Sequence, residues 1–123
     1  MRTIFASILS VILLFPLLAN AEKYKSMETL TGKFGMTGKT LGDVPPDEPR
    51  DTHMQFYLTG KAAKALYEGM KIVAVPERCE NDPNVMSKYI GDMTCQHTIK
   101  PDMYECFFGV NIEEQKIEGG WMC

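Results

Sequence analysis

The chain has 123 residues, of which 45% are hydrophobic, and its 16 acidic and 13 basic side chains give a formal net charge of −3. This length predicts one domain. A net negative charge gives the protein no electrostatic reason to bind nucleic acid or an anionic membrane surface.

The first 21 residues have the pattern of a secretory signal peptide. Arg2 precedes an apolar run over residues 4–18, and the small residues Ala19-Asn20-Ala21 follow. The run is too short for a membrane anchor, and no cysteine stands at the cleavage point for lipid attachment. Removal of residues 1–21 leaves 102 residues with 12 basic and 16 acidic side chains, a net charge of −4. We therefore expect a periplasmic or secreted protein that begins at Glu22 and has no membrane anchor.

Four cysteines follow the predicted cleavage point: Cys79, Cys95, Cys106 and Cys123. An even number of cysteines in a small exported domain predicts a set of disulfides. A domain of this size buries a limited core, so each disulfide is expected to add about 2–4 kcal/mol to stability.

Residues 22–52 are predicted as a flexible Gly/Pro-rich arm. Glycine stands at positions 32, 35, 38 and 42, and Pro45, Pro46 and Pro49 lie within five residues. This composition disfavours regular strand pairing. A short strand over residues 27–34 is the exception that we consider.

The ordered domain is predicted over residues 53–123 and begins with a strand and a helix. Apolar and polar residues alternate over residues 53–58, which is typical of a half-buried strand. Thr59 can cap a helix that ends near Gly69. Its apolar face comprises Ala62, Ala63, Leu66, Tyr67 and Met70, whereas Lys61, Lys64 and Glu68 are expected in solvent. Residues 71–75 favour a strand, and residues 77–87 are predicted as a loop.

The C-terminal third predicts a three-stranded antiparallel meander. Residues 93–99, 104–112 and 117–123 each alternate in phase, and polar turns at residues 100–102 and 113–116 join them. The fold class expected from these elements is α+β, with one amphipathic helix packed on a disulfide-tied antiparallel sheet.

The register of the second hairpin favours one disulfide connectivity. If the turn places Ile112 opposite Ile117, then Cys106 lies opposite Cys123 within disulfide reach, and Cys79 is left to pair with Cys95. A longer loop in the first hairpin would instead place Cys95 opposite Cys106, so this alternative remains open.

No metal or cofactor is expected from the sequence. Gly38-Lys39-Thr40 resembles the end of a phosphate-binding loop, but the motif's first glycine is replaced by Lys33. The cysteines lack the close spacing of zinc ligands, and the segment 80–84 lacks the features of an EF-hand loop. The methionines are dispersed, which favours core packing over copper binding. His53 is expected at the surface and His97 in the core or at its rim.

The sequence favours a non-enzymatic binding protein of the cell envelope, an inhibitor or immunity-type protein that blocks another protein's site. No serine or cysteine has the setting of a catalytic nucleophile, and a small stapled domain suits rigid contact through its loops. A basic envelope hydrolase or toxin would complement its acidity. The candidate contact residues are Tyr57 and Phe107 together with the loop acids Asp47, Glu48, Glu77, Glu80 and Asp82.

Two questions stay open at this level. Phe107 lies on the outward parity of its strand, where it can either contact a partner or be covered by the twist of the sheet. Two other functions also remain as alternatives: a small-ligand or metal-binding module that uses the 77–84 loop and His97, and a small carboxylate-dependent hydrolase.

Overall fold

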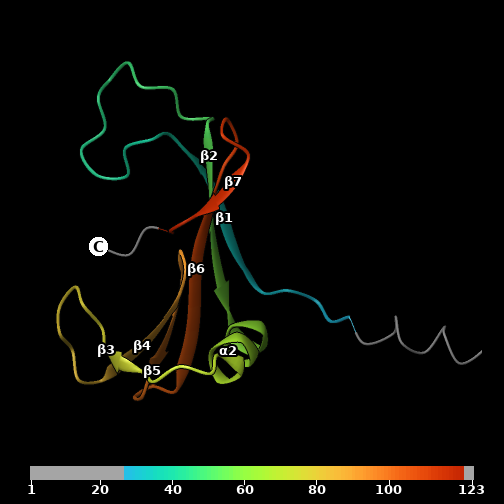
Figure 1. Cartoon of the computed structure of the whole chain (residues 1–123), viewed down its shortest axis with the longest axis vertical. Coiled ribbons are helices and arrows are strands. Elements are labelled where there is room, and N and C mark those ends of the chain that lie inside the picture. The colour runs from blue at the N-terminus through green and yellow to red at the C-terminus, as the bar shows by residue number, and fades with distance from the viewer. Residues whose placement is uncertain (1–26, 121–123) are drawn as a thin grey trace, which may run out of the picture.

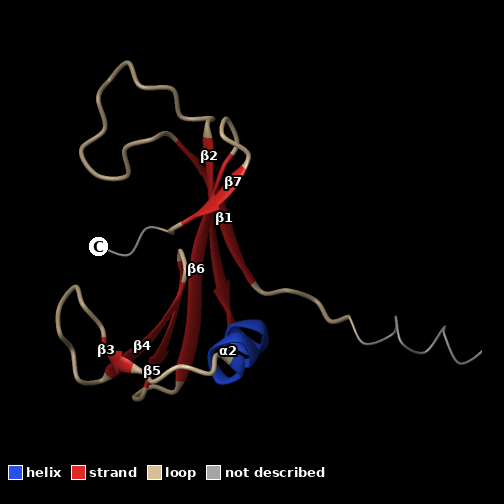
Figure 2. Ribbon diagram, in the orientation of Figure 1, coloured by secondary structure: helices blue, strands red, loops and turns tan. Residues whose placement is uncertain are grey.

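The structure, a computed structural model, describes residues 27–120. Within these residues seven strands form one antiparallel sheet, and one helix packs against it (Figure 1, Figure 2). The predicted α+β class is confirmed in this form, with the sheet as the larger part. The predicted signal peptide, its cleavage point, Trp121 and Cys123 lie outside the described residues.

One central strand, β6, joins the two parts of the sheet. In chain order the elements are β1 (Gly32–Thr37), β2 (His53–Thr59), α2 (Gly60–Gly69), β3 (Val75–Pro76), β4 (Val85–Ile90), β5 (Met93–Thr98), β6 (Met103–Asn111) and β7 (Lys116–Glu118). The order across the sheet is β1-β2-β6-β5-β4-β3, and β7 also pairs with β6. β2 lies along one side of β6, whereas β5 and β7 lie end to end along its other side. The predicted side-by-side meander of the three C-terminal strands is therefore wrong, because β2 takes the place beside β6 that was expected for the last strand.

The predicted arm contributes a strand to the sheet. The strand considered over residues 27–34 is present with shifted bounds, as β1 over Gly32–Thr37, and it pairs with β2. The long loop of residues 38–52 connects the two strands. Alternation over residues 53–58 predicted β2, and this prediction is confirmed.

The helix α2 packs through the predicted face. Ala63, Tyr67 and Met70 are buried, Leu66 is half-buried and packs against the core, and Lys61 and Lys64 are exposed. Thr59 precedes the helix in an extended conformation, but its side chain makes no capping hydrogen bond.

Lys88 of β4 caps the C-terminal end of α2. Its ammonium group donates hydrogen bonds to the carbonyl oxygens of Tyr67 (2.9 Å) and Met70 (3.1 Å), and it lies 4.5 Å from the centre of the Tyr67 ring. A cation at this end of a helix stabilises carbonyls that have no partner within the helix. Lys88 thus fastens α2 to the sheet.

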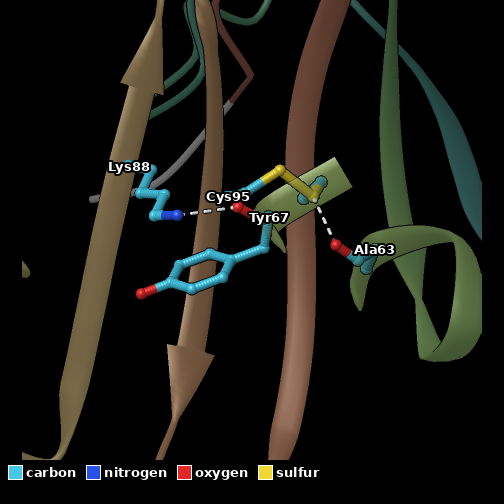
Figure 3. The surroundings of a disulfide bond; sticks show 5 residues. Ala63, Tyr67, Lys88 and Cys95 are labelled. Atoms are coloured by element: carbon cyan, nitrogen blue, oxygen red, sulfur yellow. Dashed lines mark hydrogen bonds between the residues drawn. A yellow bond between two sulfur atoms is a disulfide. The ribbon is translucent and has the colours of Figure 1, made fainter. Parts of the chain in front are cut away.

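A buried disulfide between β5 and β6 forms the floor under the helix (Figure 3). Cys95 and Cys106 are directly opposite in the sheet, with Cα atoms 4.0 Å apart, and both are fully buried. The Cys106 sulfur lies 3.6 Å from the carbonyl oxygen of Ala63. The small Ala63 side chain allows this close approach of the helix to the sheet.

The favoured disulfide connectivity is wrong, and the alternative that pairs Cys95 with Cys106 is confirmed. The second hairpin pairs Val110 with Ile117, not with Gly119, so the register differs by two residues. The side chain of Asn111 accepts a hydrogen bond from the Glu114 N–H (2.9 Å), which starts the turn earlier than predicted.

The other half of the favoured connectivity, Cys79 with Cys95, is also wrong. Cys79, expected to pair with Cys95, is also disulfide-bonded. Its partner is not Cys95, which is bonded to Cys106, and Cys123 lies outside the described residues.

Strand β4 lies partly in the segment predicted as a loop. Val85–Ile90 pairs with β5 along its length. Ser87 is fully buried, and Lys88 points under α2, so two polar side chains occupy interior positions and weaken the hydrophobic signal. The strand expected over residues 71–75 is reduced to β3, Val75–Pro76.

Candidate functional site

The face of the sheet opposite α2 carries the two predicted aromatic contact residues. Leu58 of β2 pairs with Cys106 of β6 on the helix side, so the preceding Tyr57 and the following Phe107 point to the other face. No helix of residues 27–120 covers that face, which we call the open face. Phe107 is half-buried there, because Gly120 lies against it, and its neighbour Thr94 is buried.

Tyr57 and Phe107 are brought together across β2 and β6. Their ring centres are 5.1 Å apart with an angle of 39° between the planes. The Tyr57 hydroxyl donates a hydrogen bond to the carboxylate of Glu105. Burial, followed by the hydrogen bond and charge of Glu105, raises the pKa of Tyr57 to about 12. The ring is therefore held neutral and in one orientation.

Two hollows lie on either side of Tyr57, and together with that ring they form what we call the open-face groove. The larger has a volume of about 540 Å³, and the smaller about 360 Å³. Both are lined by Tyr57. The larger reaches the N-terminal end of α2, and its other lining residues are Thr59, Gly60, Lys61, Lys64, Asp102, Met103, Tyr104 and Glu105. The other lining residues of the smaller are Lys33, Phe34, Gly35, Gln55, Phe56 and Phe107. Hollows of this size are in the range of ligand and peptide sites.

A chain of contacts fixes the wall of the larger hollow. The Nε2 atom of His97 lies 2.6 Å from the Oδ1 atom of Asp102, and the imidazole stacks on Tyr104 with ring centres 4.2 Å apart. Tyr67 of the helix meets both rings edge-on. His97 is thus part of an aromatic cluster at the rim of the core, as predicted.

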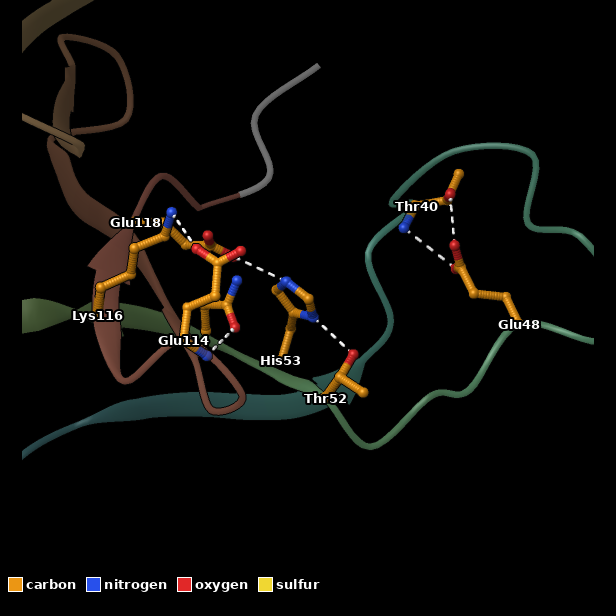
Figure 4. Close-up of polar contacts among 8 residues, drawn as sticks. Thr40, Glu48, Thr52, His53, Glu114, Lys116 and Glu118 are labelled. Carbon is orange, nitrogen blue, oxygen red and sulfur yellow. Dashed lines mark hydrogen bonds and ion pairs between the residues drawn. The ribbon is translucent and has the colours of Figure 1, made fainter.

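Glu48 organises the loop of residues 38–52 (Figure 4). Its carboxylate accepts hydrogen bonds from the hydroxyl (2.7 Å) and backbone N–H (3.1 Å) of Thr40. The hydroxyl bond of Thr40 is the main cause that lowers the pKa of Glu48. Thr40, the last residue of the triplet that resembles a phosphate loop, is therefore bound to a carboxylate. The neighbouring Asp47 is exposed.

Glu77 lies in the second acidic loop, but its carboxylate is turned inward. It is only 5% exposed and accepts hydrogen bonds from the backbone N–H groups of Cys79 (2.8 Å), Glu80 (2.6 Å) and Asp82 (3.1 Å). These amides, that of Asp82 first, lower the pKa of Glu77. A carboxylate ahead of a polar turn is a recognisable signal for such bonding.

The side chains predicted to face a partner therefore differ in availability. Glu80 is exposed and Asp82 is half-buried, and the latter accepts a hydrogen bond from the N–H of Asn84 (2.8 Å). In Figure 1 the two acidic loops, residues 38–52 and 77–84, extend to the side of the sheet away from α2, one at each end. No residue of either loop lines the groove.

His53, predicted at the surface, is buried at the start of β2, which lies on the side of β6 opposite β7 (Figure 4). Its Nε2 atom lies 3.2 Å from a carboxylate oxygen of Glu118, and its Nδ1 atom lies 2.7 Å from the hydroxyl of Thr52. The side chain ties the short strand β7 to β2. The sequence does not predict this contact, because β2 and β7 are far apart in the chain and lie on opposite sides of β6.

The described part of the chain shows no cluster of three or more His, Cys, Asp or Glu side chains that could hold a metal ion. No helix in residues 27–120 is both long and apolar enough to cross a membrane. Comparison with protein-family models, with curated proteins and with solved structures finds no match to the chain.

Proposed function

We propose that the protein is an exported, non-enzymatic binding protein of the inhibitor or immunity type, which occupies a site on another protein. The observation that carries this proposal is the open-face groove, where Tyr57 lines both hollows and the Phe107 ring beside it lines the smaller one. The buried Cys95–Cys106 disulfide is compatible with an oxidising compartment outside the cytoplasm.

The groove has the properties of a binding hot spot. Aromatic side chains contribute a large share of the binding energy at interfaces, particularly where they are held in place before the partner arrives. Tyr57 is held by Glu105 and by the Phe107 ring. A partner's side chain that enters either hollow would therefore meet a preformed surface and lose little binding energy to its ordering.

The acidic loops supply the charge that attracts a basic partner, such as an envelope hydrolase or toxin. Asp47 and Glu80 are exposed and Asp82 is half-buried. Exposed charges at the rim of an interface mainly raise the association rate. Glu48 and Glu77 support this role indirectly, because their hydrogen bonds to Thr40 and to backbone amides shape the two loops.

The test is capture of a partner from an envelope extract by the purified protein, followed by binding kinetics. We expect a stoichiometric protein partner, and Phe107→Ala should weaken its binding at least fivefold, about 1 kcal/mol or more, without changing the thermal stability greatly. Ile90→Ala is the matched control, since Ile90 is an exposed apolar residue of β4 outside the groove. Equal affinities for the two variants would contradict the proposal.

One observation favours a second candidate function. Asp102 and Glu105 both line the larger hollow, as a carboxylate-dependent hydrolase or a small-ligand site would require. The purified protein, incubated alone with cell-wall polymer, distinguishes the two functions. Turnover that is lost in Glu105→Gln would favour the hydrolase and overturn the binding-protein proposal.

A further inference from the structure

Strand β1 is a long free edge of the sheet. In the described residues β1 pairs only with β2, and all of its residues except Thr37 are exposed. The other end of the sheet is β3, which has two residues and ends in Pro76. A short strand with proline is a protected edge, whereas a six-residue strand with bare backbone groups can pair with another strand.

The alternation of bonded and non-bonded residue pairs between β1 and β2 shows which backbone groups of β1 face away from β2. The N–H of Thr59 donates to the carbonyl oxygen of Thr31 (3.0 Å), one position before the paired residues Gly32 and Leu58. Residues 31, 33 and 35 therefore direct their backbone groups to β2, since bonded and non-bonded pairs alternate in an antiparallel ladder. Gly32, Phe34 and Met36 direct theirs to the free edge.

The same edge is strongly apolar on the helix side of the sheet. Phe34 is 71% exposed and Met36 is 41% exposed. Two rows of apolar side chains start from them and cross the sheet beyond the helix, namely Phe34, Phe56 and Phe108, and Met36, Met54, Val110 and Ile117. The rings of Phe56 and Phe108 are stacked with centres 4.9 Å apart. We call these two rows the apolar platform.

We propose that a second copy of this chain pairs with the free edge, β1 to β1, antiparallel about Phe34. This register joins the outward groups of Phe34 to those of the second Phe34, and those of Gly32 to those of Met36. It keeps the two apolar platforms on one side, because directly opposite residues in a ladder point the same way. On the other side Lys33 lies opposite Gly35, so no like charges face each other.

The register about Phe34 uses the edge more fully than its neighbour. Pairing about Gly35 would also keep the platforms on one side, but it leaves the outward groups of Gly32 opposite Gly38, which is outside the strand. Pairing about Phe34 places all three outward-facing residues of each copy in bonded pairs.

The exposed area is sufficient for a weak dimer. A fully buried aromatic side chain covers about 150–250 Å², so the 71% exposure of Phe34 leaves on the order of 100–180 Å² uncovered. With the exposed Leu30 and Met36 and the two strand backbones, both copies together bury on the order of 1,000 Å². This is at the lower limit for a specific interface, and it favours a dimer that dissociates on dilution.

The experiment measures molar mass by light scattering during size-exclusion chromatography of the purified protein over a range of concentrations. The wild type should approach twice the monomer mass as the concentration rises, whereas Phe34→Lys should remain a monomer. Val73→Lys is the matched control, because Val73 is 86% exposed and lies between α2 and β3. It introduces the same charge away from β1 and should dimerise like the wild type.

Amide hydrogen exchange gives a readout that is specific to the edge. In the dimer the amides of Phe34 and Met36 should exchange at least about tenfold more slowly than in Phe34→Lys, and those of Lys33 and Gly35 should be protected in both proteins. If Phe34→Lys does not fold, Met36→Lys at the same edge replaces it. A wild type that stays monomeric, or a dimer whose Phe34 and Met36 amides exchange as in the monomer, would overturn the proposal.

Discussion

The two halves of the sheet on the helix side differ in how they are covered. Beneath α2, the side chains of Leu58, Cys95 and Cys106 are buried and the disulfide joins the two central strands. Beyond the helix, the apolar platform continues to the edge, where Phe34 and Ile117 are largely exposed. The apolar side chains under α2 therefore stabilise the fold, whereas those of the apolar platform remain exposed at the surface.

The difference follows from the position of one short helix. α2 has ten residues and begins directly after β2, so it can cover only the end of the sheet where β2 finishes (Figure 2). Lys88 fastens its C-terminal end, and Ala63 allows close contact with the disulfide. If the covered half and the uncovered half differ in this way, substitutions in the two halves should have unequal effects.

Loss of the buried disulfide should have the largest effect. We expect the double substitution of Cys95 and Cys106 by alanine to lower the free energy of unfolding by about 3 kcal/mol, because the crosslink restricts the unfolded chain between two residues with a sequence separation of 11. Urea denaturation measures the change. Mass mapping of the unreduced wild type should show a Cys95–Cys106 peptide and a second crosslink between the peptides of Cys79 and Cys123. A loss below about 1 kcal/mol would contradict the central role of this bond.

Truncation of one apolar side chain in each half should give unequal losses. Leu58→Ala, in the covered half, is expected to lower stability by about 2–3 kcal/mol, because it removes buried methyl groups from the core. Phe34→Ala, in the uncovered half, should change stability by about 0.5 kcal/mol or less at concentrations where the protein is monomeric. Equal losses in chemical denaturation would mean that the two halves are not distinct.

Removal of the helix cap should have a smaller effect. Lys88→Met keeps the aliphatic stem but loses the hydrogen bonds to the carbonyls of Tyr67 and Met70, and we expect a loss of about 1–2 kcal/mol. Lys61→Met is the control, since the side chain of Lys61 is 81% exposed and pairs with Glu28 at the surface. Thermal unfolding of both variants compares them, and a similar change in both would show that Lys88 does not fasten the helix.

The smallest effect is expected at high pH, on the open face. Because the pKa of Tyr57 is raised to about 12, its contribution to stability is fully present below about pH 10 and is lost as the pH rises through 12. An absorbance titration of tyrosinate in the wild type and in Tyr57→Phe isolates this group. If the absorbance step that is lost in Tyr57→Phe has its midpoint near pH 10, Glu105 does not hold the ring.

The elements with regular alternation or a clear helical face were predictable from the sequence. These include β2, α2, and the strands β5 and β6 of the meander. Strand β4 was not, because Ser87 and Lys88 are polar residues in interior positions, where one is buried and the other caps the helix. The Cys95–Cys106 disulfide depends on the register of the hairpin that residues 99–102 close, where Thr98 pairs with Met103. The Asn111 side chain sets the turn of the second hairpin, which removes the register that favoured Cys106–Cys123. Periodicity predicts neither turn.

The candidate site was predictable only in part. The strand parity of Phe107 places it on the outer face, as the structure shows, and Tyr57 was named on its own strand. Their contact depends on the pairing of β2 with β6, which are far apart in the chain, and no local pattern predicts such a pairing. The inward turn of Glu77 was missed because a charged residue in a loop is usually solvated.

The central position of β6 also has a consequence for the order in which the chain can acquire its structure. A chain that emerges N-terminus first presents β1, β2 and α2 long before residues 103–111 appear. Until then Leu58 and Phe56 have ladder partners only in β1, because their partners on the other side of β2 are Cys106 and Phe108. An isolated hairpin and a single short helix are at most marginally stable in water. β1, β2 and α2 therefore cannot form a stable core until β6 is present, so almost the whole chain has to emerge before the domain can fold.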